Sequence, residues 1–524
     1  MADGSSNSMG KQTPAWIRVV MPSGADLIFV ALLSALVFTP LSMRLLGDAG
    51  IGWHIRTGQQ ILATHAIPPV DLFSSTMTGK PWFAWEWLYD LVVGQLEATL
   101  GLNGVVWLTA LVIAAVFAWT FRLLIARGTN VLVALALVLL AVAGSMIHFL
   151  ARPHVVSWLF TLAWFWILDS SEREGFDGRG GPEPPWIRAL PLLMLVWVNV
   201  HGGFLVGFVL LGIFLFGAAW TWFKTSNDRI EEMRLKIAAG KRIRNLTGVG
   251  LLCLAASLVN PYGWKLYEHI DRYLSSGFLM DHIDEFQSPN FHRIAQRCFL
   301  LLLLFTIAVL ALRGRGLRMS QGLTILFAVY AGLYASRSIP VSSLLLVMVV
   351  GPFVPARFAA GFSQRMAAIE VGMRAHLWPV LALVGTLAIA ANGGRIGSRV
   401  WMDAHFDPQR MPVGAVNYLE KNEVVGPVFS PDSWGGYLIY RLYPKMRVVV
   451  DDRHDLYGEE FFKSYLKAVR GERGWQEFLL THQSSCLLLP KDAALANLVA
   501  LSKGWKQIYA DDVAVVFVRE PVKP

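Results

Sequence analysis

Charged residues are scarce in this chain. Only 16% of its 524 residues are Asp, Glu, Lys or Arg, whereas soluble domains carry about 25%. Hydrophobic residues make up 55% of the sequence, and the mean hydropathy is +0.47. Many apolar runs approach the roughly 20 residues that a helix needs to cross the hydrocarbon core of a bilayer. The composition therefore excludes an ordinary soluble protein and predicts an α-helical polytopic membrane protein.

Cysteines and common cofactor motifs are also scarce. Cys253 and Cys298 fall in predicted spans and Cys486 in the C-terminal region, without metal-ligand spacing, so we expect no disulfide framework. The C-terminal region has no Walker motif, no G-x-G-x-x-G and no C-x-x-C. The first apolar run lacks a small-residue cleavage site beside it, and we interpret it as a retained span.

Eleven apolar segments predict membrane spans within a transmembrane region, residues 25–394, that follows a tail, residues 1–24. The predicted spans are 25–45, 102–123, 129–149, 154–170, 187–200, 203–223, 246–261, 297–313, 320–336, 339–355 and 376–392. After about residue 395 the composition becomes that of a small soluble α/β domain, residues 395–524. Its strands are predicted at 427–430, 446–452, 485–490 and in a closing hairpin at 505–520; its helices at 413–422, 459–471, 474–483 and 493–502.

Lysine and arginine collect in three loops that the predicted spans place on one side of the membrane. The stretch 224–245 alone carries seven basic residues, and 313–318 and 356–376 are also basic. The positive-inside rule makes this side the cytoplasm. The tail 1–24 is then cytoplasmic, and the loops 46–101 and 260–297 and the C-terminal domain lie outside. The net charge of +9 is explained by these loops, without a nucleic-acid partner.

The first outer loop, residues 46–101, is too long and too rich in acids and tryptophans to be a simple connector. Long loops in compact proteins commonly carry function, so we interpret this loop as part of a site. A short amphipathic helix on the membrane is predicted at 51–62. A second interfacial or re-entrant helix is predicted at 85–101.

Three acids of this loop are candidate catalytic residues. Asp48 follows the first span directly, where a carboxylate at the membrane surface could deprotonate an acceptor hydroxyl. Glu86 stands between two tryptophans, and burial against the membrane would raise its pKa. Asp71 follows Pro-Pro-Val, where a turn or helix cap is the structural alternative.

Arginines and histidines recur at the outer ends of the predicted spans. Arg152 lies in an outer turn, His201 follows a break in an apolar run, and Arg337 ends a span. Ionisable residues at the membrane are costly, and arginines and helix ends bind phosphate, so the set predicts a phosphate or pyrophosphate headgroup site. Snorkelling, or pairing with the loop acids, is the alternative for each residue alone. The substrate-binding candidates are His54, Arg56, Trp85, Arg152, His201, Glu285 and Arg337.

These features together resemble the GT-C membrane glycosyltransferases, which include oligosaccharyltransferases, protein mannosyltransferases and lipid A aminoarabinose transferases. The shared pattern is a first span closing on an acid, a long outer loop with interfacial helices, a dozen or so spans and an outer C-terminal domain. Within this class the chain is similar to bacterial members, through segments that span most of it. These are GWHIRTGQQIL, PVDLFSS, PWFAWEWL, ARPHVVSWLF, WVNVHGGFLVG, NPYG and SWGGYLIYRLYPKMRVVVDDR.

The resemblance implies an enzyme of the bacterial inner membrane. It would move a sugar from a polyprenyl-phosphate carrier to a lipid, glycan or protein acceptor on the outer face, and Asp48 matches the first-loop carboxylate of that class. Ala49 and Gly50 replace the usual compact acidic pair, so a divalent cation remains open. The Trp-Gly-Gly-Tyr stretch 434–437 matches the acceptor motif of oligosaccharyltransferases only in part. A turn whose glycines let a helix pack against a sheet is the alternative.

Two other functional classes stay open. The first is a transporter or flippase for a lipid-linked or anionic solute, because broken helices such as the one around His201 also occur in transporters. No internal repeat of the transporter kind is visible in the sequence. The second is a non-catalytic scaffold for envelope assembly. The transferase hypothesis also makes a geometric prediction: Asp48 and Arg337 should open into one outward-facing cavity beneath the first outer loop.

Overall fold

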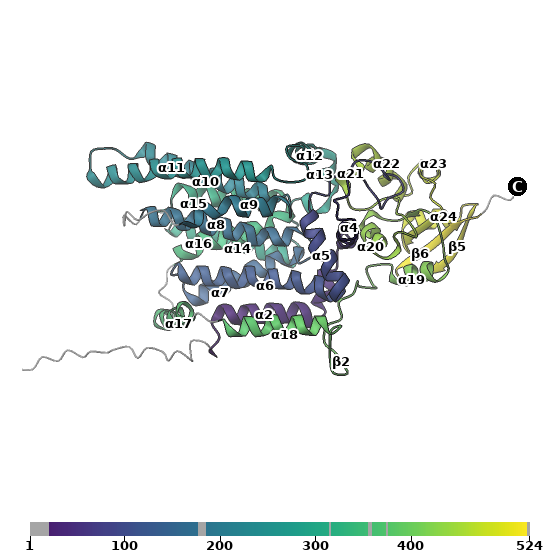
Figure 1. The fold of residues 1–524 in the computed structure, drawn as a ribbon, viewed down its shortest axis with the longest axis horizontal. Coiled ribbons are helices and arrows are strands. Elements are labelled where there is room, and N and C mark those ends of the chain that lie inside the picture. The colour runs from purple at the N-terminus through teal and green to yellow at the C-terminus, as the bar shows by residue number, and fades with distance from the viewer. Residues whose placement is uncertain (1–19, 177–184, 314–315, 355–358, 374–375, 521–524) are drawn as a thin grey trace, which may run out of the picture.

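The computed structural model describes residues 20–176, 185–313, 316–354, 359–373 and 376–520, so most of the predicted tail lies outside the described residues. Long helices run side by side in a bundle, and a mixed α/β region sits at one end (Figure 1). The helices of the bundle and its loops are α2 (Gly24–Phe38), α3 (Leu41–Leu45), α4 (Ile51–Thr64), α5 (Trp87–Leu100), α6 (Leu102–Ala126), α7 (Val131–Ser145), α8 (His154–Phe176), α9 (Leu190–Val198), α10 (Phe204–Lys224), α11 (Ile230–Ser257), α12 (Lys265–Leu274), α13 (Gly277–His282), η3 (Asp284–Phe286), α14 (Ile294–Arg313), α15 (Met319–Tyr334), η4 (Ser336–Ser338), α16 (Ile339–Val350), α17 (Ala360–Gly372) and α18 (Leu377–Ala391). The C-terminal elements are β1 (Arg395–Ile396), β2 (Arg399–Val400), α19 (Val413–Lys421), β3 (Val428–Phe429), α20 (Asp432–Leu442), α21 (His454–Tyr457), α22 (Glu459–Val469), α23 (Trp475–Thr481), β4 (Cys486–Pro490), α24 (Ala494–Ala500), β5 (Trp505–Ala510) and β6 (Ala514–Arg519).

All eleven predicted spans coincide with helical segments, but fewer are long enough to cross a membrane. Within the described residues, five helices pass on length and hydropathy: α6, α10 and α14, and α7 and α16 with their flanking turns. The pair α17 and α18, bent by 61°, gives a sixth if it counts as one span. The helices α2, α9 and α15 are apolar but shorter. The structure thus supports a polytopic membrane protein with five or six candidate spans, and the count of eleven is not confirmed.

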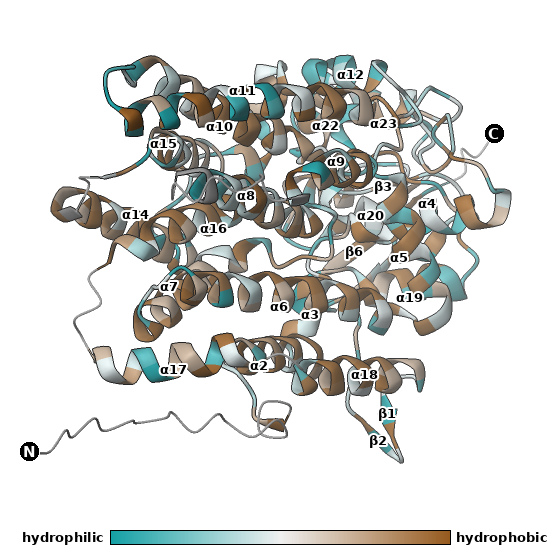
Figure 2. Ribbon diagram, turned by 60° about the vertical axis from the view of Figure 1, so that its left-hand side comes forward, coloured by the Kyte–Doolittle hydropathy of each residue, from teal (hydrophilic) through white to brown (hydrophobic). Residues whose placement is uncertain are grey.

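The two ends of the bundle differ in character. The start of α11 and the helix α17 lie at the left end in Figure 1, whereas α4, α5, α12 and the C-terminal region lie at the right end. Figure 2 shows apolar residues along most bundle helices and polar residues in α12 and in the loop before α11. The long loops predicted to lie outside therefore gather at the end opposite the loop 224–245.

A four-stranded sheet, in the order β3-β4-β6-β5, organises the C-terminal region. β3 pairs parallel with β4, whereas β4–β6 and β6–β5 are antiparallel. Alternate residues of a strand face opposite sides of a sheet. Accordingly, Leu488 and Val516 join the apolar core that continues into the bundle, whereas Leu487 and Phe517 belong to a second core with residues of α22, α23 and α24. One side of the sheet is thus continuous with the helix bundle.

Residues 446–452 do not form the regular strand that the sequence predicts. They are largely buried, but Val448 makes only isolated bridges, to Val428 of β3 and to Ser74 of the first outer loop. The Ser75 N–H donates to the Val448 carbonyl at 2.8 Å. The segment fails to propagate as a strand because one neighbour is an irregular loop. Through the bridges of Val448, the segment 446–452 joins the C-terminal sheet to the first outer loop, residues 46–101.

The glycines of the Trp-Gly-Gly-Tyr stretch lie inside helix α20, not in a turn. A Cβ on Gly436 would lie 2.3 Å from the Ala49 carbonyl oxygen, and one on Gly52 would lie 2.1 Å from the Gly436 carbonyl oxygen. The two glycines therefore let α20 and α4 approach backbone to backbone. Their role is to hold the first outer loop against the C-terminal region.

Replacing Gly52 or Gly436 with alanine is expected to destabilise the protein by about 1–3 kcal/mol, because the new methyl group meets backbone that cannot rotate away. Thermal unfolding of the purified protein in detergent measures the change. Gly248→Ala is the matched control, since its Cβ would meet nothing within 4 Å in helix α11. Equal melting temperatures for Gly52→Ala and Gly248→Ala would contradict the close packing of α4 on α20.

Candidate active site

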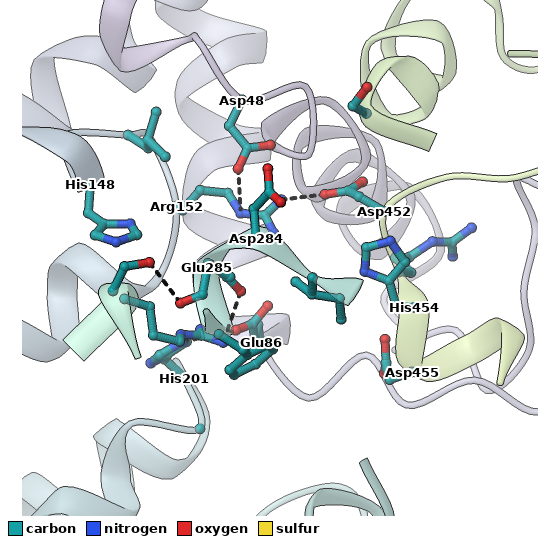
Figure 3. Close-up of a pocket in the computed structure, with 18 of the residues that line it drawn as sticks. Asp48, Glu86, His148, Arg152, His201, Asp284, Glu285, Asp452, His454 and Asp455 are labelled. Atoms are coloured by element: carbon teal, nitrogen blue, oxygen red, sulfur yellow. Dashed lines mark hydrogen bonds and ion pairs between the residues drawn. The ribbon is translucent and has the colours of Figure 1, made fainter. Parts of the chain in front are cut away.

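A cavity of about 1000 Å³ lies where the end of the bundle meets the C-terminal region (Figure 3). The first outer loop, the turn before α8, the break between α9 and α10, the η3 and η4 segments and residues 452–455 all contribute to its wall. Most of the predicted site residues line it: Asp48, Trp85, Glu86, Arg152, His201, Glu285 and Arg337. Asp48 and Arg337 thus share one cavity, as the sequence analysis predicts.

The other three predicted site residues, His54, Arg56 and Asp71, do not line this cavity. Arg56 donates from Nε to the Tyr440 carbonyl at 2.9 Å, which ties α4 to α20. Asp71 accepts hydrogen bonds from the backbone of the turn that follows it and pairs with Arg453 at 2.8 Å. His54 is completely buried behind the wall. The contacts of Arg56 and Asp71 are structural, and we do not carry these two residues into a chemical step.

Asp71→Ala is expected to cost about 3–5 kcal/mol of stability, because it removes one partner of the buried Arg453 guanidinium. Burial opposes ionisation of Asp71, but Arg453 and the Ser74 hydroxyl hold the pKa of this carboxyl below its usual value. A folded pKa below the unfolded pKa of about 4 means that the stabilisation is complete above that pH and is lost as the pH falls through the folded pKa.

Thermal unfolding between neutral and acidic pH measures this effect. Asp492→Ala, at an exposed position, is the control. A melting temperature for Asp71→Ala that matches the control at neutral pH would show that the ion pair contributes no stability.

Asp48 turns one carboxylate oxygen to the backbone and the other towards the cavity. Its Oδ1 accepts from the Gly50 N–H at 2.8 Å, just before α4 begins. Its Oδ2 lies 3.7 Å from Arg152 Nε, and 33% of the side chain remains exposed. The carboxylate is therefore fixed in position and open to a molecule in the cavity.

Arg152 lies between two carboxylates from distant parts of the chain (Figure 3). Its Nη1 donates to Asp452 Oδ2 at 3.0 Å, and the Trp53 indole donates to Asp452 Oδ1 at 3.0 Å. Burial alone would lower the pKa of Arg152, but Asp48 and Asp452 raise it above its usual value, so the guanidinium is charged. Burial raises the pKa of Asp452 to about 6, against the opposing charge of Arg152.

The hydrogen bonds of His201 fix its tautomer. The Gly203 N–H donates to Nδ1 at 3.0 Å, and the Ser157 hydroxyl lies 2.8 Å from the same nitrogen. Because Ser157 Oγ itself accepts from the Trp197 indole, its proton points to Nδ1. Burial holds the pKa of His201 well below its usual value, so the ring is neutral with its proton on Nε2.

Two donors then face one another across a small space. His201 Nε2 lies 3.4 Å from Arg337 Nη2, and with the proton on Nε2 both atoms are donors. Arg337 also pairs through Nη1 with Glu285 at 3.0 Å. Burial opposes ionisation of Glu285, but Arg337 brings the pKa of this carboxyl down to about 2. Converging donors without an acceptor are the arrangement that an anionic oxygen completes.

Glu86 lies beside these donors and differs from the other cavity acids. Its Oε1 is 3.8 Å from His201 Nε2, and its Oε2 is 3.8 Å from His54 Nε2. Burial raises the pKa of the Glu86 carboxyl to about 8, against the charges of Arg152 and Arg337. The group is therefore mostly protonated at neutral pH and can donate a proton, whereas Asp48 is placed to accept one.

An inner pocket of about 30 Å³ joins these groups. That volume holds one or two small polar atoms, since a bound water needs about 10–15 Å³ by this measure. Its lining residues are Asp48, Glu86, Leu150, Arg152, Pro153, His154, His201, Glu285 and Arg337. A base, an acid and two guanidinium groups thus surround a space of the size of a phosphate oxygen.

The arrangement does not fit a divalent cation. Asp48 and Asp452 are the acids that a cation would bridge, but the Arg152 guanidinium lies between them. Across the part of the chain that the structure describes, no group of three or more His, Cys, Asp or Glu side chains could hold a metal ion. We therefore derive no chemical step through a metal.

Comparison with known proteins gives a likeness of fold. No protein-family model matches the chain, and no curated protein sequence matches it. The fold is similar to the crystal structure of ArnT from Cupriavidus metallidurans bound to undecaprenyl phosphate. The TM-score is 0.46 and the sequence identity 14%, over 94% of this chain and 97% of that one.

The C-terminal region supplies cavity residues that the sequence analysis does not assign to the site. Asp452, His454 and Asp455 line the cavity, and His454 Nε2 pairs with Asp432 at 2.8 Å. The signal in the sequence is the run Asp-Asp-Arg-His-Asp directly after a buried apolar stretch. Asp90 of α5 also lines the cavity without having been assigned to the site, and it contacts His54.

Proposed function

We propose that this chain is a membrane glycosyltransferase of the bacterial inner membrane. It takes a sugar from a polyprenyl-phosphate carrier and transfers it to a lipid, glycan or protein acceptor on the outer face. The observation that carries the proposal is the convergence of Asp48, Glu86, Arg152, His201 and Arg337 on one inner pocket at the end of an apolar helix bundle. The proposed topology has eleven spans, a cytoplasmic tail, and residues 395–524 outside as a separate domain.

The carrier phosphate binds at the inner pocket. The Arg337 guanidinium and the His201 Nε2–H already converge there, and Arg152 supplies a second fixed positive charge. A sugar phosphate ester gains negative charge on its bridging oxygen as the sugar leaves, and fixed donors stabilise that charge more in the transition state than in the ground state. The apolar helices beside the cavity provide the surface on which the polyprenyl chain lies.

Asp48 and Glu86 have opposite roles in the transfer. The Asp48 carboxylate accepts the proton of the acceptor hydroxyl as the oxygen attacks the sugar, and the bond from the sugar to the phosphate oxygen breaks. The protonated Glu86 donates to the leaving phosphate. The fixed position of Asp48 Oδ1 leaves Oδ2 free for this contact.

The rest of the cavity is suited to sugars. Its wall combines aromatic rings, including Trp85 and Tyr273, with the carboxylates Asp432 and Asp455. Aromatic faces pack against the apolar faces of sugar rings, and carboxylates accept hydrogen bonds from hydroxyl groups. A cavity of about 1000 Å³ is at the upper end of ordinary ligand pockets, which leaves room for a donor sugar and part of an acceptor.

The test is sugar transfer by the purified protein in lipid nanodiscs, with labelled sugars on undecaprenyl phosphate and a membrane extract as the acceptor source. The proposal expects label to leave the carrier and appear in the acceptor fraction. Label that stays on the carrier but crosses sealed vesicles would favour the transporter instead. If no donor sugar is transferred and no carrier-linked label crosses the vesicles, only the scaffold function is left.

A further inference from the structure

Behind Glu86, the structure places a histidine and an aspartate whose side chains are buried, the aspartate at the cavity wall. His54 of α4 and Asp90 of α5 are both fully buried, and His54 Nδ1 lies 2.5 Å from Asp90 Oδ1. The Trp53 and Tyr89 rings pack around the imidazole, with Trp53 stacked at a centroid distance of 3.6 Å. Burying an acid and a base costs folding free energy unless they form hydrogen bonds with each other or with a neighbouring group.

The second nitrogen of His54 points at Glu86. His54 Nε2 is 3.8 Å from Glu86 Oε2. This nitrogen is buried and has no hydrogen-bond partner among the described residues. Asp90 Oδ2 is also buried without a partner. A rotation of the Glu86 side chain that brings Oε2 to about 3 Å from Nε2 would complete a hydrogen bond. The unpaired nitrogen of His54 therefore faces Glu86, the acid that borders the inner pocket.

Burial favours the neutral form of both members of the pair. Burial lowers the pKa of His54 well below its usual value, and burial raises the pKa of Asp90 well above its usual value. A neutral carboxyl at 2.5 Å from Nδ1 donates its proton to that nitrogen, which leaves the imidazole proton on Nε2. Glu86 then has an imidazole N–H on each side, from His54 and from His201.

We propose that Asp90 and His54 form a proton relay that returns a proton to Glu86 after Glu86 has protonated the leaving phosphate; the relay rests on the function proposed above. The His54 Nε2 proton moves to the Glu86 carboxylate, and the Asp90 Oδ1 proton moves to His54 Nδ1. Glu86 and His54 end neutral, and Asp90 ends as a carboxylate that accepts a hydrogen bond from Nδ1–H. When Glu86 takes a proton from water in the cavity, the same two transfers run backwards. His54 and Asp90 are thus positioning residues that act through Glu86.

Charged groups on every neighbouring element act on this chain of protons. Glu86 faces Arg152 before α8, Arg337 of η4, Glu285 of η3 and Asp455 of α21. Arg453 of the C-terminal region, His154 and His201 also interact electrostatically with His54. None of these groups lies between His54 and Asp90, which are 2.5 Å apart, so a substitution at position 90 reports on the relay itself.

The experiment is an infrared titration of the full-length protein in nanodiscs. It follows the carbonyl stretches of Glu86 and Asp90 together, identified as the bands that disappear in Glu86→Gln and in Asp90→Asn. In the wild type the pair should lose one carbonyl band as the pH rises, because the two carboxyl groups then hold one proton fewer between them. His54→Phe keeps the ring volume but removes the N–H that stabilises the Glu86 carboxylate, so the midpoint should rise by about one pH unit, the size of one hydrogen bond to a charged group.

Asp90→Asn keeps a donor to Nδ1 but has no proton to give. Under the relay the negative charge can no longer move to position 90, and the midpoint should rise. A fall would show that Asp90 carries a fixed negative charge, and an unchanged midpoint would show that Asp90 is only structural; either result overturns the relay. This second variant decides the question if His54→Phe does not fold.

His405→Gln is the matched control, because His405 contacts Asp403 at 3.4 Å in an exposed pair and should leave the midpoint unchanged. The titration needs no sugar substrate. If the variants shift the midpoint but the protein transfers no sugar, Glu86 is coupled to this pair and the proposed transferase function is rejected. If the protein transfers sugar but the midpoint does not shift, only the relay is rejected.

Discussion

Asp48→Asn should abolish sugar transfer, with a loss in kcat of about 10²- to 10⁴-fold, the usual contribution of a general base. The amide has the shape of the carboxylate and keeps the carbonyl that accepts from the Gly50 N–H. What it loses is the ability to take a proton from the acceptor hydroxyl. The measurement is the initial rate of label transfer at saturating carrier sugar.

The same variant should bind the carrier at least as tightly as the wild type, because removing a negative charge near Arg152 strengthens its attraction for phosphate. Asp403→Asn, at an exposed site outside the cavity, is the control and should keep the full rate. Transfer at the wild-type rate by Asp48→Asn would assign the base to another acid of the cavity, with Asp452 as the next candidate.

Arg337→Met should weaken the binding of undecaprenyl phosphate by about 10- to 100-fold, since a hydrogen bond to a charged group is worth about 1.5–3 kcal/mol and 1.4 kcal/mol is tenfold in Kd. Arg337 is better suited to this test than Arg152. It is 30% exposed and pairs with an accessible Glu285, whereas Arg152 is wedged between Asp48 and Asp452. Equilibrium binding in nanodiscs gives the Kd.

Removing Arg337 leaves the Glu285 carboxylate without its partner, so the double variant Glu285→Gln/Arg337→Met separates lost attraction from new repulsion. It should still bind more weakly than Glu285→Gln alone. Arg399→Met removes an exposed arginine of the β1–β2 hairpin and should not change the Kd. A Kd for Arg337→Met equal to that of Arg399→Met would place the phosphate elsewhere.

The sequence predicts the helices of the bundle well because each arises from one long, contiguous apolar segment. All eleven predicted spans are helical, and the helices near 413–422, 459–471 and 493–502 are confirmed. Hydropathy alone does not fix the number of spans, since α2, α9 and α15 are apolar helices that are shorter than the candidate spans. The segment 446–452 has the composition of a strand but lies against an irregular loop, which no local pattern shows.

Residues that line the cavity can be anticipated from the sequence where they interrupt or end an apolar run. Asp48, Arg152, His201 and Arg337 stand at ends or breaks of apolar runs, and all of them line the cavity. Asp71 is also an acid of the first outer loop, like Asp48. Its partner Arg453 is far away in the sequence, so the burial of Asp71 could not be anticipated. Asp452 and Asp90 were missed for the same reason, because only tertiary contacts bring them to Arg152 and His54.

The most direct measurement is an experimental structure of the protein in nanodiscs with undecaprenyl phosphate, a polyprenyl phosphate of the proposed carrier class. The account predicts the phosphate at the mouth of the inner pocket with one oxygen inside it, in contact with Arg337 and His201 Nε2 and within reach of Arg152, and the polyprenyl chain on the apolar helices. A phosphate bound at the opposite, basic end of the bundle, or a cavity that stays empty at saturating lipid, would contradict it.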